Sequence, residues 1–215
     1  MKFLKLTLAT LFFVISAPLA HAADYKQGSD YQRIIPPVPT NTTDKIEVVE
    51  VFSYGCSHCF RFEPLVERWQ KKLDDDVEFT YMPAIFSRAG VFDATMEVYA
   101  KAYYAAEALG VLDKVHNAFF DAIHVNKNPL NTVAAVVKVV EQQGVDGQAF
   151  KKAMKSFTVA AKVRRAKELM GRYRVQGTPS MVVNGKYITS PTRQLSARNM
   201  LKLVDQLIDE ERKAR

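Results

Sequence analysis

Residues 46–59 read IEVVEVFSYGCSHC, and this stretch decides the fold. Ile46 to Phe52 is rich in β-branched residues, which predicts a central buried strand. The strand is expected to end in residues 53–55, and a helix to begin at or near Cys56 and to run to about Lys72. The chain's two cysteines therefore lie at the start of a helix that follows a buried strand.

The spacing of Cys56 and Cys59 favours a reactive pair over a structural disulfide. In the loop-entropy model a four-residue ring stabilises a fold by about 2 kcal/mol, against about 4.7 kcal/mol for a 100-residue loop. A disulfide that opens and closes needs one thiolate that attacks and a second thiol that resolves the mixed disulfide. The helix start lowers the pKa of Cys56, and Cys59, almost one turn later, is expected to be more buried. A secreted structural protein with an inert disulfide is the alternative.

A C-x-x-C pair is also half of a zinc site, so the histidines matter. There is no third cysteine, His21 lies in the predicted leader, and His116 and His124 lie in a predicted helical block. Neither of these two has a partner nearby in the sequence, and we interpret both as structural. We therefore expect no metal and no cofactor.

Residues 1–22 are typical of a secretory signal peptide. Lys2 and Lys5 precede the mostly apolar residues 6–19, and residues 20–22 (AHA) form a small-x-small cleavage site. An apolar run of about 14 residues is shorter than the roughly 20 that span a bilayer, which disfavours a membrane anchor. Cleavage would lower the formal charge of +7 by two. The remaining basic residues are spread out, which disfavours nucleic-acid binding, and we expect a soluble exported chain with no stable membrane insertion.

The order of elements predicts an α/β domain that is divided by an all-helical insertion. Two buried strands joined by the cysteine helix would pair in parallel, and Asn184-Gly185 predicts a β-hairpin. The pattern from Phe86 to about Phe157 is helical, with no strand signal. The expected elements are strands 31–35, 46–52 and 77–82, the helical block, a helix over 159–173, a hairpin over 181–189 and a last helix from near Ser196. We divide the mature chain into residues 23–85, an insertion over 86–157, and residues 158–215.

Glu50 is the unusual residue of the first buried strand. Strand alternation places it on one face with three apolar residues, Ile46, Val48 and Phe52. A carboxylate there should have a raised pKa, and under the cysteine helix it could move protons to or from Cys59. The alternative is a strand-edge glutamate that reaches water.

Two further candidates are His58, which lies between the two cysteines, and the dipeptide Thr178-Pro179. The ring of His58 can donate a hydrogen bond to the Cys56 thiolate or add positive charge near it, which would make the disulfide more oxidising. Thr178-Pro179 opens the predicted hairpin, where a proline is allowed. With a cis bond there, the backbone of Thr178 could pair with an extended peptide, although the sequence does not specify the isomer.

Residues 50–59 (EVFSYGCSHC) and 177–187 (GTPSMVVNGKY) resemble the signature stretches of the bacterial periplasmic DsbA family. The resemblance extends over essentially the whole mature chain and implies a thioredoxin fold with an inserted all-helical domain. It implies that Cys56 is the nucleophile and Cys59 the resolving thiol. The family roles it carries over are thiolate stabilisation by His58, a cis proline at Pro179, the buried acid at Glu50 and a second relay carboxylate at Glu63.

The resemblance implies a periplasmic enzyme that donates its disulfide to reduced, unfolded exported proteins through a mixed disulfide at Cys56. A membrane partner resembling the quinone-linked DsbB would reoxidise it, and a monomer is expected. Ser57-His58 replaces the family's usual Pro-His, which should change the redox potential, and Tyr81 takes the place of a lysine found in some members. An isomerase or reductase on the same fold is one alternative, although these usually add a dimerisation domain for which this chain has no room. A non-catalytic peptide-binding module is another.

Overall fold

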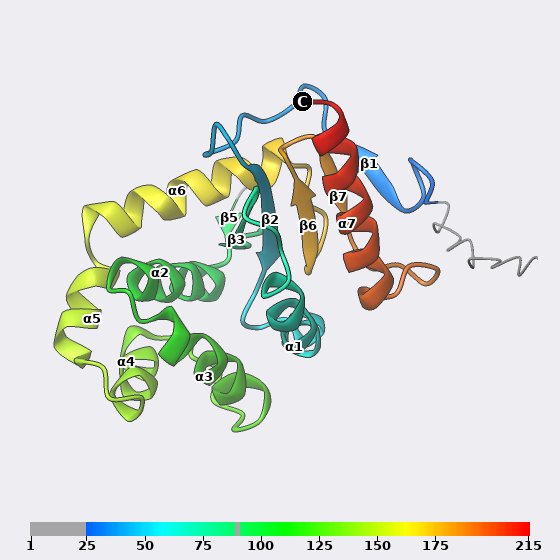
Figure 1. Ribbon diagram of the computed structural model, residues 1–215. Coiled ribbons are helices and arrows are strands. Elements are labelled where there is room, and N and C mark those ends of the chain that lie inside the picture. Colours follow the sequence, from blue (N-terminus) through cyan, green and yellow to red (C-terminus); the bar gives the residue numbers. More distant parts are fainter. Residues whose placement is uncertain (1–24, 89–90) are drawn as a thin grey trace, which may run out of the picture.

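The computed structural model describes residues 25–88 and 91–215, so the predicted signal peptide lies outside the described residues. Five strands form one mixed sheet in the order β1-β7-β6-β2-β3 (Figure 1). Their bounds are Tyr31–Arg33 (β1), Ile46–Phe52 (β2), Val77–Pro83 (β3), Ser180–Val183 (β6) and Tyr187–Thr189 (β7). The helices are Ser57–Gln70 (α1), Ala94–Ala108 (α2), Leu112–His124 (α3), Val133–Gln142 (α4), Gly147–Met154 (α5), Phe157–Arg172 (α6) and Ala197–Lys213 (α7).

Strand β2 is the centre of the sheet, as its sequence predicts. It pairs in parallel with β3 and antiparallel with β6, and all 7 of its residues are buried. Helix α1 connects the two parallel strands, which is the crossover that parallel pairing requires. The thioredoxin-like arrangement expected from the sequence is therefore confirmed.

Helices cover both faces of the sheet (Figure 1). On one face Ile46 and Val48 pack with Phe62 of α1 and Val204 of α7. The opposite face packs against α6 and the helical block, with Val49 in that cluster. Because β2 contributes side chains to both cores, its sequence is mostly apolar on both faces rather than alternating. Glu47 and Glu50 are the two exceptions.

One feature of the helical block differs from the prediction. Two short strands, Ser87–Arg88 (β4) and Val91–Phe92 (β5), form an antiparallel pair just before α2, where no strand was expected. Each has 2 residues, too few for a period-2 pattern to be visible in the sequence. The rest of the block is helical, as predicted, and comprises α2 to α5. The division of the chain at residues 86 and 157 stays a prediction.

The tight hairpin between β6 and β7 confirms the Asn184-Gly185 signal. Both residues have positive φ, 50° at Asn184 and 62° at Gly185. A Cβ atom on Gly185 would lie 1.9 Å from the carbonyl oxygen of Val38. Glycine is therefore required here both by the turn and by the close approach of the connector that follows β1.

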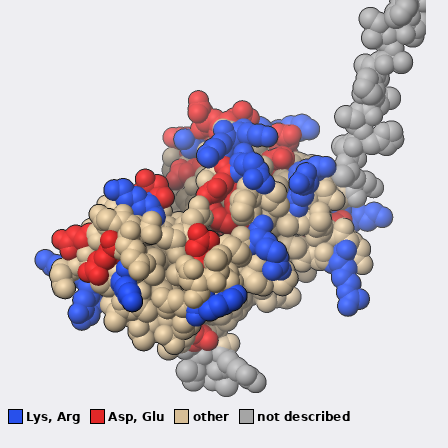
Figure 2. Space-filling view, turned by 90° about the horizontal axis from the view of Figure 1, so that it is seen from below, with Lys and Arg blue, Asp and Glu red and all other residues tan. Residues whose placement is uncertain are grey.

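Charged side chains of both signs are interspersed on the face shown in Figure 2, and the basic ones do not form a stripe. Within the described part of the chain, no helix combines the length and the apolar character needed to cross a bilayer.

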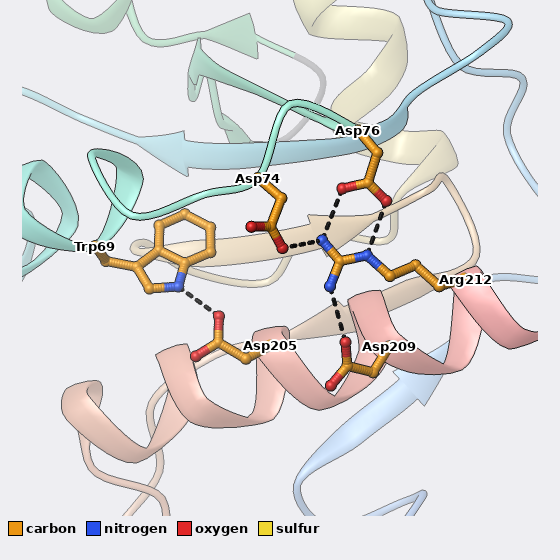
Figure 3. A network of polar contacts seen from close by, with 6 residues as sticks. All are labelled: Trp69, Asp74, Asp76, Asp205, Asp209 and Arg212. Carbon is orange, nitrogen blue, oxygen red and sulfur yellow. Dashed lines mark hydrogen bonds and ion pairs between the residues drawn. The ribbon is translucent and has the colours of Figure 1, made fainter.

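A network of ion pairs fixes the C-terminal helix to the loop between α1 and β3 (Figure 3). The guanidinium of Arg212 donates two hydrogen bonds to Asp76, at 2.8 and 2.7 Å. It also donates to Asp74 at 2.7 Å and to Asp209 on its own helix at 2.9 Å. These contacts hold α7 beside α1, which carries the cysteines.

Candidate active site

Cys56 is the N-terminal cap of α1, as the sequence predicts. Its backbone is extended, with φ −89° and ψ 115°, and its N–H donates to the carbonyl of Ser53 at 3.0 Å. Cys56 is partly exposed and Cys59 is fully buried, and both are free thiols. Gly55 permits this turn to approach the helical block, because a Cβ atom there would lie 3.1 Å from the ring of Tyr99.

The two thiols have opposite acidities. A hydrogen bond from the Cys59 thiol is the largest cause that lowers the pKa of Cys56, from 9.0 to about 4. Partial burial opposes this effect, and the Thr178 side chain and the backbone N–H groups of Cys59 and His58 add to it. Burial, the hydrogen bond to Cys56 and the charge of Glu50 all raise the pKa of Cys59. Cys56 is thus the thiolate and Cys59 the thiol at neutral pH.

Thr178 and Pro179 lie beside Cys56 and also line a groove. The peptide bond between them is cis, and Cys56 Sγ lies 3.3 Å from the carbonyl oxygen of Thr178. A groove of about 430 Å³ runs beside this point. Its lining includes His58, Thr178, Pro179, Tyr31 and Ile188.

The side chain of His58 is exposed at the rim of this groove. Its backbone N–H, rather than its ring, is among the groups that lower the pKa of Cys56. A role for the imidazole in stabilising the thiolate therefore stays a prediction, whereas the contribution of the helix start has a structural basis.

Glu50 is completely buried, so it does not reach water at a strand edge. Neither of its carboxylate oxygens has a hydrogen-bond partner within residues 25–88 and 91–215. Burial is the largest cause that raises its pKa well above the ordinary value, and the charges of Glu63 and Cys56 add to this. The charge of Glu50 in turn raises the pKa of Cys59, and proton transfer between the two groups stays a prediction.

Glu63 is also buried, and it belongs to a polar cluster that the sequence did not reveal. Tyr81 donates a hydrogen bond to its Oε1 at 2.7 Å, and His116 Nε2 lies 3.5 Å from its Oε2. His116 Nδ1 is 2.8 Å from the hydroxyl of Tyr54. From the sequence we interpret His116 as structural, because Glu63 and Tyr54 are 53 and 62 positions away in the chain. Folding brings these residues into contact.

His124 is the second histidine whose contacts were not predicted. Its Nε2 is 2.8 Å from the carbonyl oxygen of Tyr54, and its ring stacks on Phe60 with centroids 4.9 Å apart. Tyr54 and Phe60 flank the two cysteines, so the end of α3 holds both sides of the cysteine segment. The described residues contain no group of three or more side chains suited to a metal ion.

The chain is similar in sequence to known proteins of one family. A family model described as a DSBA-like thioredoxin domain matches residues 47–202. The chain is 39% identical to the thiol:disulfide interchange protein DsbA of Pseudomonas aeruginosa, over 97% of this chain and 94% of the relative. It is 40% identical to the DsbA of Azotobacter vinelandii, over 89% of this chain and 87% of the relative.

Solved structures agree with the sequence comparison. The crystal structure of Pseudomonas aeruginosa DsbA superposes with a TM-score of 0.83 at 39% identity, covering 90% of this chain and 97% of the other. The oxidoreductase DsbA from Xylella fastidiosa superposes with a TM-score of 0.77 at 31% identity, covering 86% of this chain and 96% of the other.

Proposed function

The chain belongs to the DsbA family of thiol–disulfide oxidoreductases, and from this premise we propose that it donates a Cys56–Cys59 disulfide to reduced, folding exported proteins. The observation that carries the proposal is the contrast between the two thiols. Cys56 is partly exposed with a pKa of about 4, whereas Cys59 is buried and its pKa is raised. A stable Cys56 thiolate favours the reduced form of the enzyme and therefore makes its disulfide oxidising.

The reaction follows from this contrast. A substrate thiolate attacks the accessible Cys56 sulfur, the Cys56–Cys59 bond breaks, and Cys59 leaves and takes up a proton. A second substrate thiolate then attacks the substrate sulfur of the mixed disulfide and releases Cys56, whose low pKa makes it a good leaving group. The substrate loses two electrons and gains a disulfide, and the enzyme ends as the dithiol. Glu50 is the candidate to supply the proton to Cys59, because burial raises its pKa and so favours its protonated form.

The groove beside Pro179 is the proposed substrate-binding site. It is lined on one side by His58, Thr178 and Pro179, and on the other by residues of β1 and β7. An extended peptide laid in it would bring its cysteine to Cys56, and the backbone of Thr178 would be available for pairing.

We propose that the enzyme works in the periplasm, after export by the signal peptide predicted over residues 1–22. Reoxidation requires an acceptor of two electrons, and a membrane partner resembling the quinone-linked DsbB would supply it. The proposal requires no bound cofactor, because both electrons reside on the two sulfur atoms.

The first test is an equilibrium titration of the protein against reduced and oxidised glutathione. We expect a reduction potential well above the cytosolic glutathione range of roughly −220 to −260 mV. A potential within or below that range would contradict disulfide donation and favour a reductase.

The second test identifies the attacking sulfur. Incubated with a disulfide-bonded client protein, the Cys59→Ser variant should accumulate a mixed disulfide, because Cys56 attacks the client disulfide and no resolving thiol releases it, and Cys56→Ser should not. The adducts are counted by non-reducing electrophoresis and mass spectrometry. Disulfide formation in clients that persists with Cys56→Ser would contradict the catalytic assignment and favour a binding module.

A further inference from the structure

A second pocket lies between α1, Tyr81 of β3 and the first turns of α3. It has a volume of about 200 Å³, enough for several water molecules. Its lining includes Glu67, Asp113 and Asn117, which are placed toward the surface, and the buried residues Glu63 and His116. The pocket therefore connects solvent to two buried titratable groups of which the proposed function makes no use.

The facing atoms of these two groups are incompletely satisfied. Glu63 Oε2 and His116 Nε2 are 3.5 Å apart, a distance suited to an ion pair, yet neither has a hydrogen-bond partner in the described part of the chain. His116 is 8% exposed and Glu63 3% exposed. Buried polar atoms without partners are rare and expensive, so two of them at one pocket point to a mobile proton or to exchanging water.

The opposite side of the His116 ring can follow a change of charge. Nδ1 lies 2.8 Å from the hydroxyl of Tyr54, whose pKa burial raises well above the ordinary value. The hydroxyl therefore keeps its proton, and its oxygen can accept from Nδ1–H both in the neutral Nδ1–H tautomer and in imidazolium. The ring can gain or lose a proton at Nε2 without losing this hydrogen bond.

The cluster reaches toward the cysteines through strand β3. Tyr81, which donates to Glu63, is the cross-strand partner of Glu50 in the β2–β3 register. The charge of Glu63 raises the pKa of Glu50, and that of Glu50 raises the pKa of Cys59. The titratable groups that face His116 or its pocket are Tyr54 from the turn after β2, Glu63 and Glu67 from α1, Tyr81 from β3, Tyr103 from α2 and Asp113 from α3 itself.

We propose that His116, through the pocket behind α1, exchanges the protons of the resolving thiol with solvent. When Cys59 attacks a mixed disulfide at Cys56, Glu50 passes its own proton through Glu63 to His116 Nε2 and into the pocket, and the Glu50 carboxylate then takes the proton of Cys59. The bond between Cys56 and the external sulfur breaks, and that sulfur leaves with the electron pair. In the reverse direction the same groups return a proton to Cys59. His116 is a positioning and proton-exchange residue, because it touches neither sulfur.

This inference rests on the proposed function, and its test uses the full mature chain. The Cys56 mixed disulfide with glutathione is formed from reduced protein and oxidised glutathione, and its resolution by Cys59 is followed by quenched-flow mass spectrometry. His116→Gln, which cannot carry a proton, should slow resolution by roughly tenfold or more, at the lower edge of general acid–base effects, and should change its pH profile. Asn117→Ala, which lines the same pocket without a titratable group, should match the wild type.

Chemical rescue separates proton exchange from packing. In His116→Ala, added imidazole can enter the enlarged pocket, and the resolution rate should rise with imidazole concentration. Pyrazole, a ring of the same size that is not basic near neutral pH, should not rescue. Equal rescue by both rings, or an unchanged rate and pH profile in His116→Gln, would overturn the inference. A wild-type protein that forms no adduct at Cys56 would instead overturn the proposed function.

Discussion

Replacement of the buried Glu50 by glutamine should stabilise the reduced protein at neutral pH and should leave it unchanged in acid. Glu50 is fully buried, and its two carboxylate oxygens find no hydrogen-bond partner among the residues that the structure describes. Its pKa in the folded state is therefore raised well above the ordinary value of 4.5. Glutamine has nearly the shape of protonated glutamate and cannot ionise.

The size of the effect follows from proton linkage. Above pH 4.5 the unfolded chain releases the Glu50 proton while the folded chain retains it, so the free energy of unfolding falls as the pH rises. The slope is about 1.4 kcal/mol per pH unit for as long as the folded group stays protonated. For each pH unit above 4.5 in which the folded group keeps its proton, the wild type should therefore lose about 1.4 kcal/mol that Glu50→Gln keeps.

The assay is urea unfolding of both reduced proteins at half-unit steps from pH 4.5 to 8. The contribution of the Cys56 thiolate is common to both proteins and cancels in the difference to first order. Glu47→Gln is the matched control, since Glu47 is also buried in β2 but accepts hydrogen bonds from the Asn41 backbone and side chain at 3.0 and 2.7 Å. It should not gain stability. A difference between Glu50→Gln and wild type that does not vary with pH would refute the reasoning.

The other predictions concern the thiol, a turn and the C-terminal helix. The Cys56 thiolate absorbance of the reduced protein should titrate with a midpoint of about 4, so that iodoacetamide reacts readily at pH 5; a midpoint near 8.5 would contradict the hydrogen bonds assigned to it. Gly185→Ala should cost more than about 2 kcal/mol of unfolding free energy, because its Cβ would lie 1.9 Å from a backbone oxygen at positive φ. Gly171→Ala, in α6 with open space around it, should instead gain about 0.5–1 kcal/mol, and urea unfolding measures both. Arg212→Gln should cost about 1 kcal/mol, and less in 1 M salt, because its partners in Figure 3 are surface carboxylates. Arg198→Gln on the same helix should change stability by less than about 0.5 kcal/mol, and equal losses in the two variants would show that the network adds nothing.

Local signals predicted most of the fold, because they act between neighbours in the chain. The apolar run of β2, the cysteine helix and the Asn184-Gly185 turn each depend on a few consecutive residues, and all three are present. The β4–β5 pair was missed because two residues per strand carry no periodicity.

At the site, the sequence located the cysteines at the helix start and a carboxylate on the strand beneath them. It could not show that His116 and His124 of α3 contact both ends of the cysteine turn, since they lie 62 and 70 positions from Tyr54 in the chain. Nor could it show that the backbone of His58, with the thiol of Cys59, lowers the pKa of Cys56.

The sequence by itself determined which groups can react: two cysteines one helical turn apart, a histidine between them, a glutamate in an apolar strand and a proline before a hairpin. These are properties of residue type and short spacing, which follow from local geometry. Only the tertiary structure decided how strongly each group is perturbed and which groups act together. Burial, hydrogen-bond partners and distances between charges set a pKa, and all three come from segments that folding brings together from distant parts of the chain.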